Sequence, residues 1–160
     1  MHVLECYSRK QRRVTRSTYG AEILALSDGF EFAKRVAVTM AELLMPWNGL
    51  EELRQAEETG TWIVPVEAAI DAKSVYESLV AKQEKIPAED SLILVLLQSR
   101  VAIVTGRLKI IWWVHTGDML ADALTKGGVT RNILIAALEL GRWKLQQEAE
   151  SSAKRIGQET

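Results

Sequence analysis

The stretch that decides the fold reads LKIIWWVHTGDMLADALTK, residues 108–126. Its first part, Leu108–Thr116, is rich in β-branched and aromatic residues, which favour a strand. Gly117 then interrupts the pattern, and the apolar residues that follow predict a short helix over Met119–Lys126. A strand followed at once by a helix is typical of a sheet that helices cover.

Outward from this stretch, the chain alternates strand-like and helical patterns. We expect an extended segment over residues 3–14, a helix over 22–44 capped by Ser17 or Thr18, an exposed short helix or acidic loop over 47–61, a buried strand in the second half of 62–71, and helices over 72–83, 90–104 and from Thr130 onward. The helix over 90–104 is apolar almost all round, which predicts deep packing, although a strand over 101–104 is an alternative. Beyond Leu145 the polar residues predict a frayed tail. This order predicts an α/β or α+β fold.

The composition is that of one globular domain. The chain has 160 residues, of which 48% are hydrophobic and 26% are charged, and these values exclude a low-complexity chain and argue against global disorder. No apolar run is long enough to span a membrane, and the first residues lack a secretory pattern. A single cysteine, Cys6, excludes an internal disulfide. We therefore expect an intracellular protein, cytoplasmic or nuclear, that is not secreted.

The formal net charge of -1 hides a basic N-terminal stretch. Within residues 1–20, Glu5 is the one acidic residue and five residues are basic: Arg9, Lys10, Arg12, Arg13 and Arg16. One interpretation is a solvated face or a nuclear-import signal. The other is an edge that contacts the phosphates of a nucleic acid.

Three acidic residues could form a metal site if the fold brings them together. Glu22 extends the apolar stripe of the long helix, Asp71 follows a buried strand, and Asp122 lies within an otherwise apolar helix. Each has an ordinary alternative: helix-dipole stabilisation for Glu22, an N-cap for Asp71, and a cap or salt bridge for Asp122. Carboxylates that converge from strand ends and helix starts suit Mg²⁺ or Mn²⁺. Paired ions of this kind promote phosphodiester hydrolysis.

Other chemistries have little support in the sequence. His2, His115 and Cys6 are too few for a zinc site. A glycine-rich phosphate loop and a Gly-x-Ser-x-Gly elbow are both missing. His115 is either a structural histidine or a residue that handles protons beside a metal site.

Three segments resemble the ribonuclease H domain of copia-type retrotransposon polyproteins. SRKQ at residues 8–11 and VTRSTYGAEILAL at residues 14–26 resemble S-K-K-Q followed by V-x-x-S-[ST]-x-E-A-E-Y-x-A-L. DAKSV at residues 71–75 resembles D-N-x-S-A. WVHTGDMLADALTK at residues 113–126 is similar to [WY]-V-x-T-x-D-Q-L-A-D-x-L-T-K. The order and the spacing of the segments agree with the family.

The resemblance implies a ribonuclease H-like α/β fold, which in the family is a mixed five-stranded sheet with flanking helices, over residues 1–128 and without the first strand. An extra C-terminal helix over 129–145 and a polar tail over 146–160 lie beyond the segments that carry the resemblance. The resemblance also implies cleavage of the RNA strand of an RNA/DNA hybrid by two Mg²⁺ ions that four acidic residues hold. Glu22, Asp71 and Asp122 match three of these residues. The basic N-terminal residues would then face the hybrid, and a reverse transcriptase segment would precede the domain in the polyprotein.

The sequence also departs from the family pattern. The family's first catalytic aspartate lies on a strand upstream of S-K-K-Q, whereas this sequence has no aspartate before Asp28. Gly20 replaces the first glutamate of E-A-E, and Ala72 replaces the usual asparagine. We therefore expect a domain truncated at its N-terminus, with impaired cleavage. The alternative is a remnant of the same domain that binds nucleic acid without cleaving it.

Overall fold

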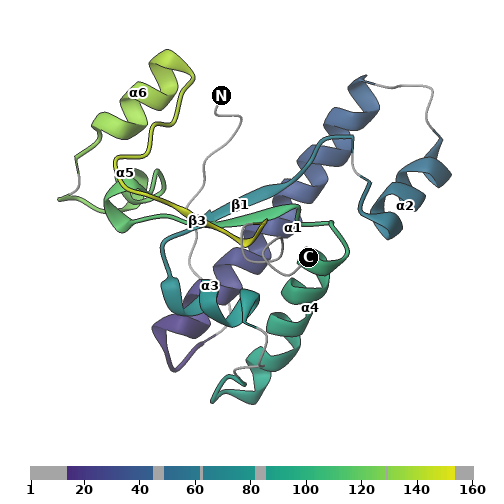
Figure 1. Cartoon of the computed structure of the whole chain (residues 1–160), viewed down its shortest axis with the longest axis horizontal. Coiled ribbons are helices and arrows are strands. Elements are labelled where there is room, and N and C mark those ends of the chain that lie inside the picture. Colours follow the sequence, from purple (N-terminus) through teal and green to yellow (C-terminus); the bar gives the residue numbers. More distant parts are fainter. Residues whose placement is uncertain (1–13, 45–48, 62, 82–85, 129, 154–160) are drawn as a thin grey trace.

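The computed structural model describes residues 14–44, 49–61, 63–81, 86–128 and 130–153. Within these residues the chain is a mixed α/β structure, mostly helical, with six α-helices and a small three-stranded sheet (Figure 1). The predicted extended segment over 3–14 lies outside the described residues except for Val14. The basic residues Arg9, Lys10, Arg12 and Arg13 also lie outside the described residues.

The elements follow one another in an alternating order. The α-helices are α1 (Thr18–Leu44), α2 (Leu50–Thr59), α3 (Lys73–Val80), α4 (Ile93–Val104), α5 (Asp122–Thr125) and α6 (Asn132–Leu140). The strands are β1 (Glu67–Ile70), β2 (Ile110–Trp113) and β3 (Glu150–Ser151), and two short 3₁₀ helices are η1 (Asp90–Leu92) and η2 (Thr116–Asp118).

The sheet is mixed, with β2 between β1 and β3. β1 and β2 are parallel, with Ile70 opposite Trp113, and the Val114 N–H donates to the Ile70 carbonyl just beyond the ladder. β3 pairs antiparallel with β2. Among the described residues, β1 is therefore an edge strand, and its carboxyl end points toward η2 and α5.

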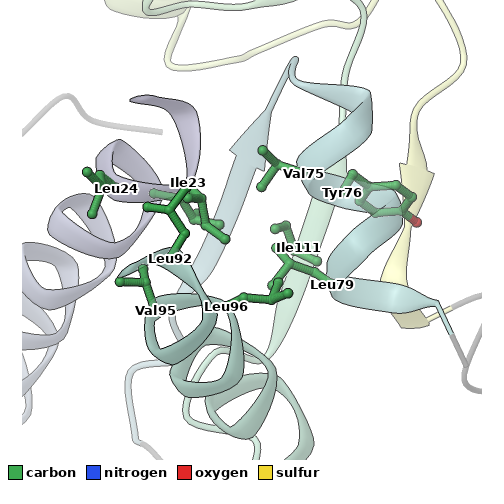
Figure 2. Close-up of a cluster of buried hydrophobic side chains, with 10 residues drawn as sticks. Ile23, Leu24, Val75, Tyr76, Leu79, Leu92, Val95, Leu96 and Ile111 are labelled. Atoms are coloured by element: carbon green, nitrogen blue, oxygen red, sulfur yellow. The ribbon is translucent and has the colours of Figure 1, made fainter. Parts of the chain in front are cut away.

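Helices α1, α3 and α4 pack on one face of the sheet around an apolar cluster. Figure 2 shows side chains from these helices and from β2 pointing toward one another. Ile23, Val75, Tyr76 and Ile111 are completely buried. Full burial of an apolar side chain of this size contributes about 1.5–3 kcal/mol. This cluster holds the start of α1 and the start of α3 against the strands.

Most predicted elements are confirmed. The long helix, the strands within 62–71 and 108–116, and the helices within 72–83 and 90–104 are all present. The strand alternative for residues 101–104 is wrong, because these residues are helical. Ser17 caps α1 as expected, since its Oγ accepts a hydrogen bond from the Gly20 N–H at 3.1 Å. Residues 50–59 of the acidic segment form a helix and not a loop.

The prediction that the helix over 90–104 is packed on all sides is wrong. Val95 and Leu96 face the core, but Leu94, Val101 and Val104 are 63%, 48% and 84% exposed. A helix reaches the sheet with one side only, so an all-apolar helix leaves its other side in water unless a further layer covers it. Apolar composition alone does not distinguish these two cases.

The C-terminal region also differs from expectation. Residues beyond Leu145 are not a frayed tail as far as residue 153, because Glu150 and Ser151 form β3. The Ser152 hydroxyl, 1% exposed, accepts a hydrogen bond from the Ile111 N–H at 3.1 Å. The predicted helix over Met119–Lys126 is shorter, a single turn that begins at Asp122. α6 is present, but its N-cap is Arg131 and not Thr130.

None of the described helices is both long enough and apolar enough to cross a lipid bilayer.

Candidate functional site

Glu22, Asp71 and Asp122 line one cleft of about 650 Å³. They come from three separate elements: α1, the carboxyl end of β1, and the first position of α5. The cleft follows the edge of β1 along its whole length. Two further carboxylates, Asp28 and Glu67, also line it. The convergence predicted for the three carboxylates is thus present at the level of a shared cleft.

The parallel pairing of β1 with β2 explains the position of Asp71. Asp71 is the first residue after β1, so it lies where the strand leaves the sheet. It is half-buried, and its backbone carbonyl accepts a hydrogen bond from the Trp113 Nε1–H at 3.1 Å. The neighbouring strand therefore holds the turn that carries Asp71. Asp71 does not cap α3 with its side chain, because the N-cap of α3 is Ala72.

The position of Asp122 follows from the single turn of α5. The Lys126 N–H donates to the Asp122 carbonyl at 2.8 Å and closes that turn. Asp122 is 7% exposed, whereas Lys126 is exposed. The Lys126 ammonium donates to the Asp122 Oδ2 at 2.7 Å. The buried carboxylate therefore has a counter-charge from its own helix, which matches the salt-bridge alternative.

Glu22 does not extend the buried stripe of α1. Its neighbour Ile23 is completely buried and faces the core, and Glu22 is exposed. Because Gly20 is also buried, α1 meets the core through the 20–23–24 side of its first turns, which leaves Glu22 on the cleft side. α1 begins at Thr18, so Glu22 stands beyond the first turn, where the helix dipole acts less.

The carboxylates of the cleft affect one another. Loss of water at the cleft wall raises the pKa of Glu22 above its ordinary value of 4.5, and the charges of Asp71 and, less strongly, Asp122 raise it further. The Lys126 ammonium acts in the opposite direction. The hydrogen bond to Asp122 in turn raises the pKa of Lys126 above 10.5. The four groups therefore form one electrostatic unit.

The donor chemistry of the cleft suits a hard divalent cation, because carboxylate oxygens are the ligands that Mg²⁺ and Mn²⁺ prefer. Within the part of the chain that the structure describes, however, no group of three or more His, Cys, Asp or Glu side chains is arranged to hold a metal ion. Glu22, Asp71 and Asp122 share a cleft without forming a preassembled ligand set.

His115 is not among the residues that line the cleft. Its Nδ1 accepts a hydrogen bond from the Gly117 N–H at 3.2 Å and caps η2. This contact matches the structural alternative for His115. Of the basic N-terminal residues, Arg16 alone is described: it is exposed, and its backbone N–H lies 3.4 Å from the Glu89 Oε2.

Sequence reasoning missed Asp118 and Lys126. Asp118 is 2% exposed, and its two carboxylate oxygens accept hydrogen bonds from the backbone N–H groups of Gln146 and Gln147 at 3.0 and 2.9 Å. The sequence contains no local signal for this contact, because the partners lie 28 and 29 residues away. Lys126 had a signal, since a lysine four residues after an aspartate on a helix is placed to pair with it.

Comparisons with protein-family models, with curated proteins and with solved structures found no match to this chain.

Proposed function

We propose that this chain is a ribonuclease H-like domain that acts on the RNA strand of RNA/DNA hybrids, with cleavage impaired in the chain as it stands. One observation supports the proposal above the others. The three residues that the motif resemblance selects, Glu22, Asp71 and Asp122, line the same cleft although they lie up to a hundred positions apart. The resemblance selected them by motif, independently of their positions in the structure.

We also propose that the three-stranded sheet is part of a ribonuclease H-like sheet. The pair of parallel strands, with α1 and α3 against it, is compatible with the second half of a ribonuclease H-like sheet. The edge of β1 that lines the cleft has no strand partner among the described residues.

The residues of the cleft have separate roles in the proposed reaction. Glu22, Asp71 and Asp122 would hold a pair of Mg²⁺ ions, which would supply an activated water and stabilise the departing oxygen of the phosphodiester. Asp71 and Asp122, which are held by the sheet and by α5, supply oxygen ligands at fixed positions. Glu22, on α1, would bring a third carboxylate to the same cleft. The exposed Arg16, together with Arg9, Lys10, Arg12 and Arg13, binds phosphates of the hybrid.

Cleavage is expected to be weak, because the resemblance implies four acidic ligands and the sequence matches three. The test is a Mg²⁺-dependent cleavage assay on a labelled RNA/DNA hybrid. We expect slow turnover that Asp71→Asn or Asp122→Asn reduces by about tenfold or more, since even substitutions of residues that only orient a metal ligand typically cost this much. Asp28→Asn is the matched control, because Asp28 lines the same cleft but is not part of the motif match.

The outcomes separate the parts of the proposal. Turnover equal to that of an intact ribonuclease H domain would show that the impairment is wrong. Turnover that is insensitive to Asp71→Asn and Asp122→Asn would overturn the site. Salt-sensitive binding of the hybrid without cleavage, retained in Glu22→Gln and lost when Arg12 and Arg13 become glutamate, would favour the binding remnant instead.

A further inference from the structure

Lys126 is placed differently from the other residues that line the carboxylate cleft. Among the described residues at the cleft, five are acidic and Lys126 alone is basic. Its ammonium lies 2.7 Å from the Asp122 Oδ2. A positively charged side chain of the protein therefore already lies beside a carboxylate of the cleft.

The position of Lys126 follows from the backbone of α5. Residues four apart on a helix lie on the same side, so the side chain of Lys126 reaches back over the turn to Asp122. The hydrogen bond between the Lys126 N–H and the Asp122 carbonyl holds this arrangement from the backbone. The ammonium thus faces the one cleft carboxylate that is buried, where a counter-charge matters most.

We propose that the Lys126 ammonium occupies the position in the cleft that a divalent cation takes, so that a cation binds only by displacing Lys126 from Asp122. This inference rests on the proposed function, in which Asp122 is a metal ligand. In this arrangement the cation that neutralises Asp122 is the side chain of Lys126.

The displacement is physically accessible because Lys126 and Asp122 differ in exposure. The Lys126 side chain is 53% exposed and that of Asp122 is 10% exposed. The ammonium can turn into water and recover its hydration, whereas the carboxylate stays in place. Since a buried carboxylate needs a counter-charge, arrival of the divalent ion and departure of Lys126 are coupled. Lys126 therefore sets the concentration of cation at which the cleft fills.

The test measures Mn²⁺ binding to the full chain by calorimetry and by the signal of free Mn²⁺ in electron paramagnetic resonance. We expect Lys126→Gln to bind Mn²⁺ about tenfold more tightly than the wild type, because a competing positive charge a few ångströms away is removed. Lys126→Arg, which keeps the charge, is expected to bind no more tightly than the wild type. The matched control is Lys34→Gln, since Lys34 forms a similar ion pair with Glu31 at 3.2 Å but does not line the cleft.

A second readout follows Lys126 directly. The ¹³Cε resonance of Lys126 is expected to shift when Mg²⁺ is added to the wild type, and that of Lys34 is expected to stay unchanged. Circular dichroism of each variant verifies that it folds.

The failures of the two proposals are distinguishable. Equal Mn²⁺ affinity in Lys126→Gln and wild type, together with weaker binding in Asp122→Asn, overturns the role of Lys126 and leaves the proposed function standing. Tighter binding in Lys126→Gln without any hybrid cleavage supports the role of Lys126 and counts against the nuclease. Absence of any Asp122-dependent Mn²⁺ binding in both wild type and Lys126→Gln overturns both.

Discussion

Two buried aspartates, four residues apart in sequence, belong to different regions and are neutralised in different ways. In the turn at η2, Asp118 receives backbone N–H groups on both carboxylate oxygens. In α5, Asp122 receives the ammonium of a half-exposed lysine on one oxygen. Both carboxylates are almost completely removed from water. Burial of an acidic residue therefore does not by itself distinguish a structural role from a chemical one.

The donors make the difference. The N–H groups of Gln146 and Gln147 belong to the backbone, and they leave Asp118 only if the C-terminal segment detaches. Trp143 reinforces this attachment, since its Nε1–H donates to the Asp118 carbonyl at 3.0 Å. The ammonium of Lys126 moves by side-chain rotation alone. The partners of the Asp118 carboxylate are consequently fixed, whereas the partner of the Asp122 carboxylate can be exchanged.

The largest expected effect is that of Asp118→Ala on stability. Each hydrogen bond to the carboxylate contributes about 1.5–3 kcal/mol, and the substitution leaves two backbone donors unpaired. We expect the free energy of unfolding to fall by about 3 kcal/mol or more, measured by urea denaturation. A loss below about 1 kcal/mol would mean that water replaces the carboxylate and that the η2 region is not a structural anchor.

A smaller stability effect is expected for Asp122→Asn. The substitution removes an ion pair with an exposed partner, and such pairs are worth about 0.2–1 kcal/mol. The free energy of unfolding is therefore expected to change by less than about 1 kcal/mol in the same urea experiment, while Mn²⁺ binding is lost. If Asp122→Asn destabilised the protein as much as Asp118→Ala, the distinction between the two aspartates would be wrong.

The smallest effect is a shift in the titration of Glu22. Asp71→Asn is expected to lower the pKa of Glu22 toward 4.5, because it removes a neighbouring negative charge. Lys126→Gln is expected to raise it, because it removes the positive charge that lowers it. Titration of the Glu22 side-chain carboxyl by NMR measures both. Shifts of the same sign in both variants would contradict the electrostatic coupling across the cleft.

The raised pKa of Glu22 also makes the stability of the protein depend on pH. The folded state holds this proton more tightly than the unfolded state, so between pH 4.5 and the raised pKa it binds more protons. The contribution of Glu22 to stability is therefore greatest at low pH and falls as the pH rises through this window. Glu22→Gln is expected to remove this part of the pH dependence.

Elements with a strong local pattern could be predicted from the sequence. The long apolar repeat of α1 and the β-branched and aromatic run of β2 carry their own signals, and the structure has both where they were expected. The shared cleft of Glu22, Asp71 and Asp122 was predictable because carboxylates at strand ends and helix starts meet at one edge of a sheet.

Features that depend on distant partners could not be predicted. β3 consists of Glu150 and Ser151, which have no strand signal, and it forms because β2 offers an edge to pair with. Leu94 and Val104 have the same apolar character as the buried residues of α4, so the sequence cannot tell which side the core covers. The exposure of Glu22 was missed because a residue at the beginning of a helix can continue the apolar stripe in spacing without touching the core.

The contact between Asp118 and the backbone at Gln146 and Gln147 has a consequence for biosynthesis. A ribosome makes the chain from its N-terminus, so the carboxylate of Asp118 exists well before its two donors do. The apolar side chains of the cluster around Ile23, Val75 and Ile111 all precede this late segment in the chain, but the Ile111 N–H also takes its acceptor, the Ser152 hydroxyl, from it. The central strand and the turn beside the cleft are therefore both completed by the last described segment of the chain.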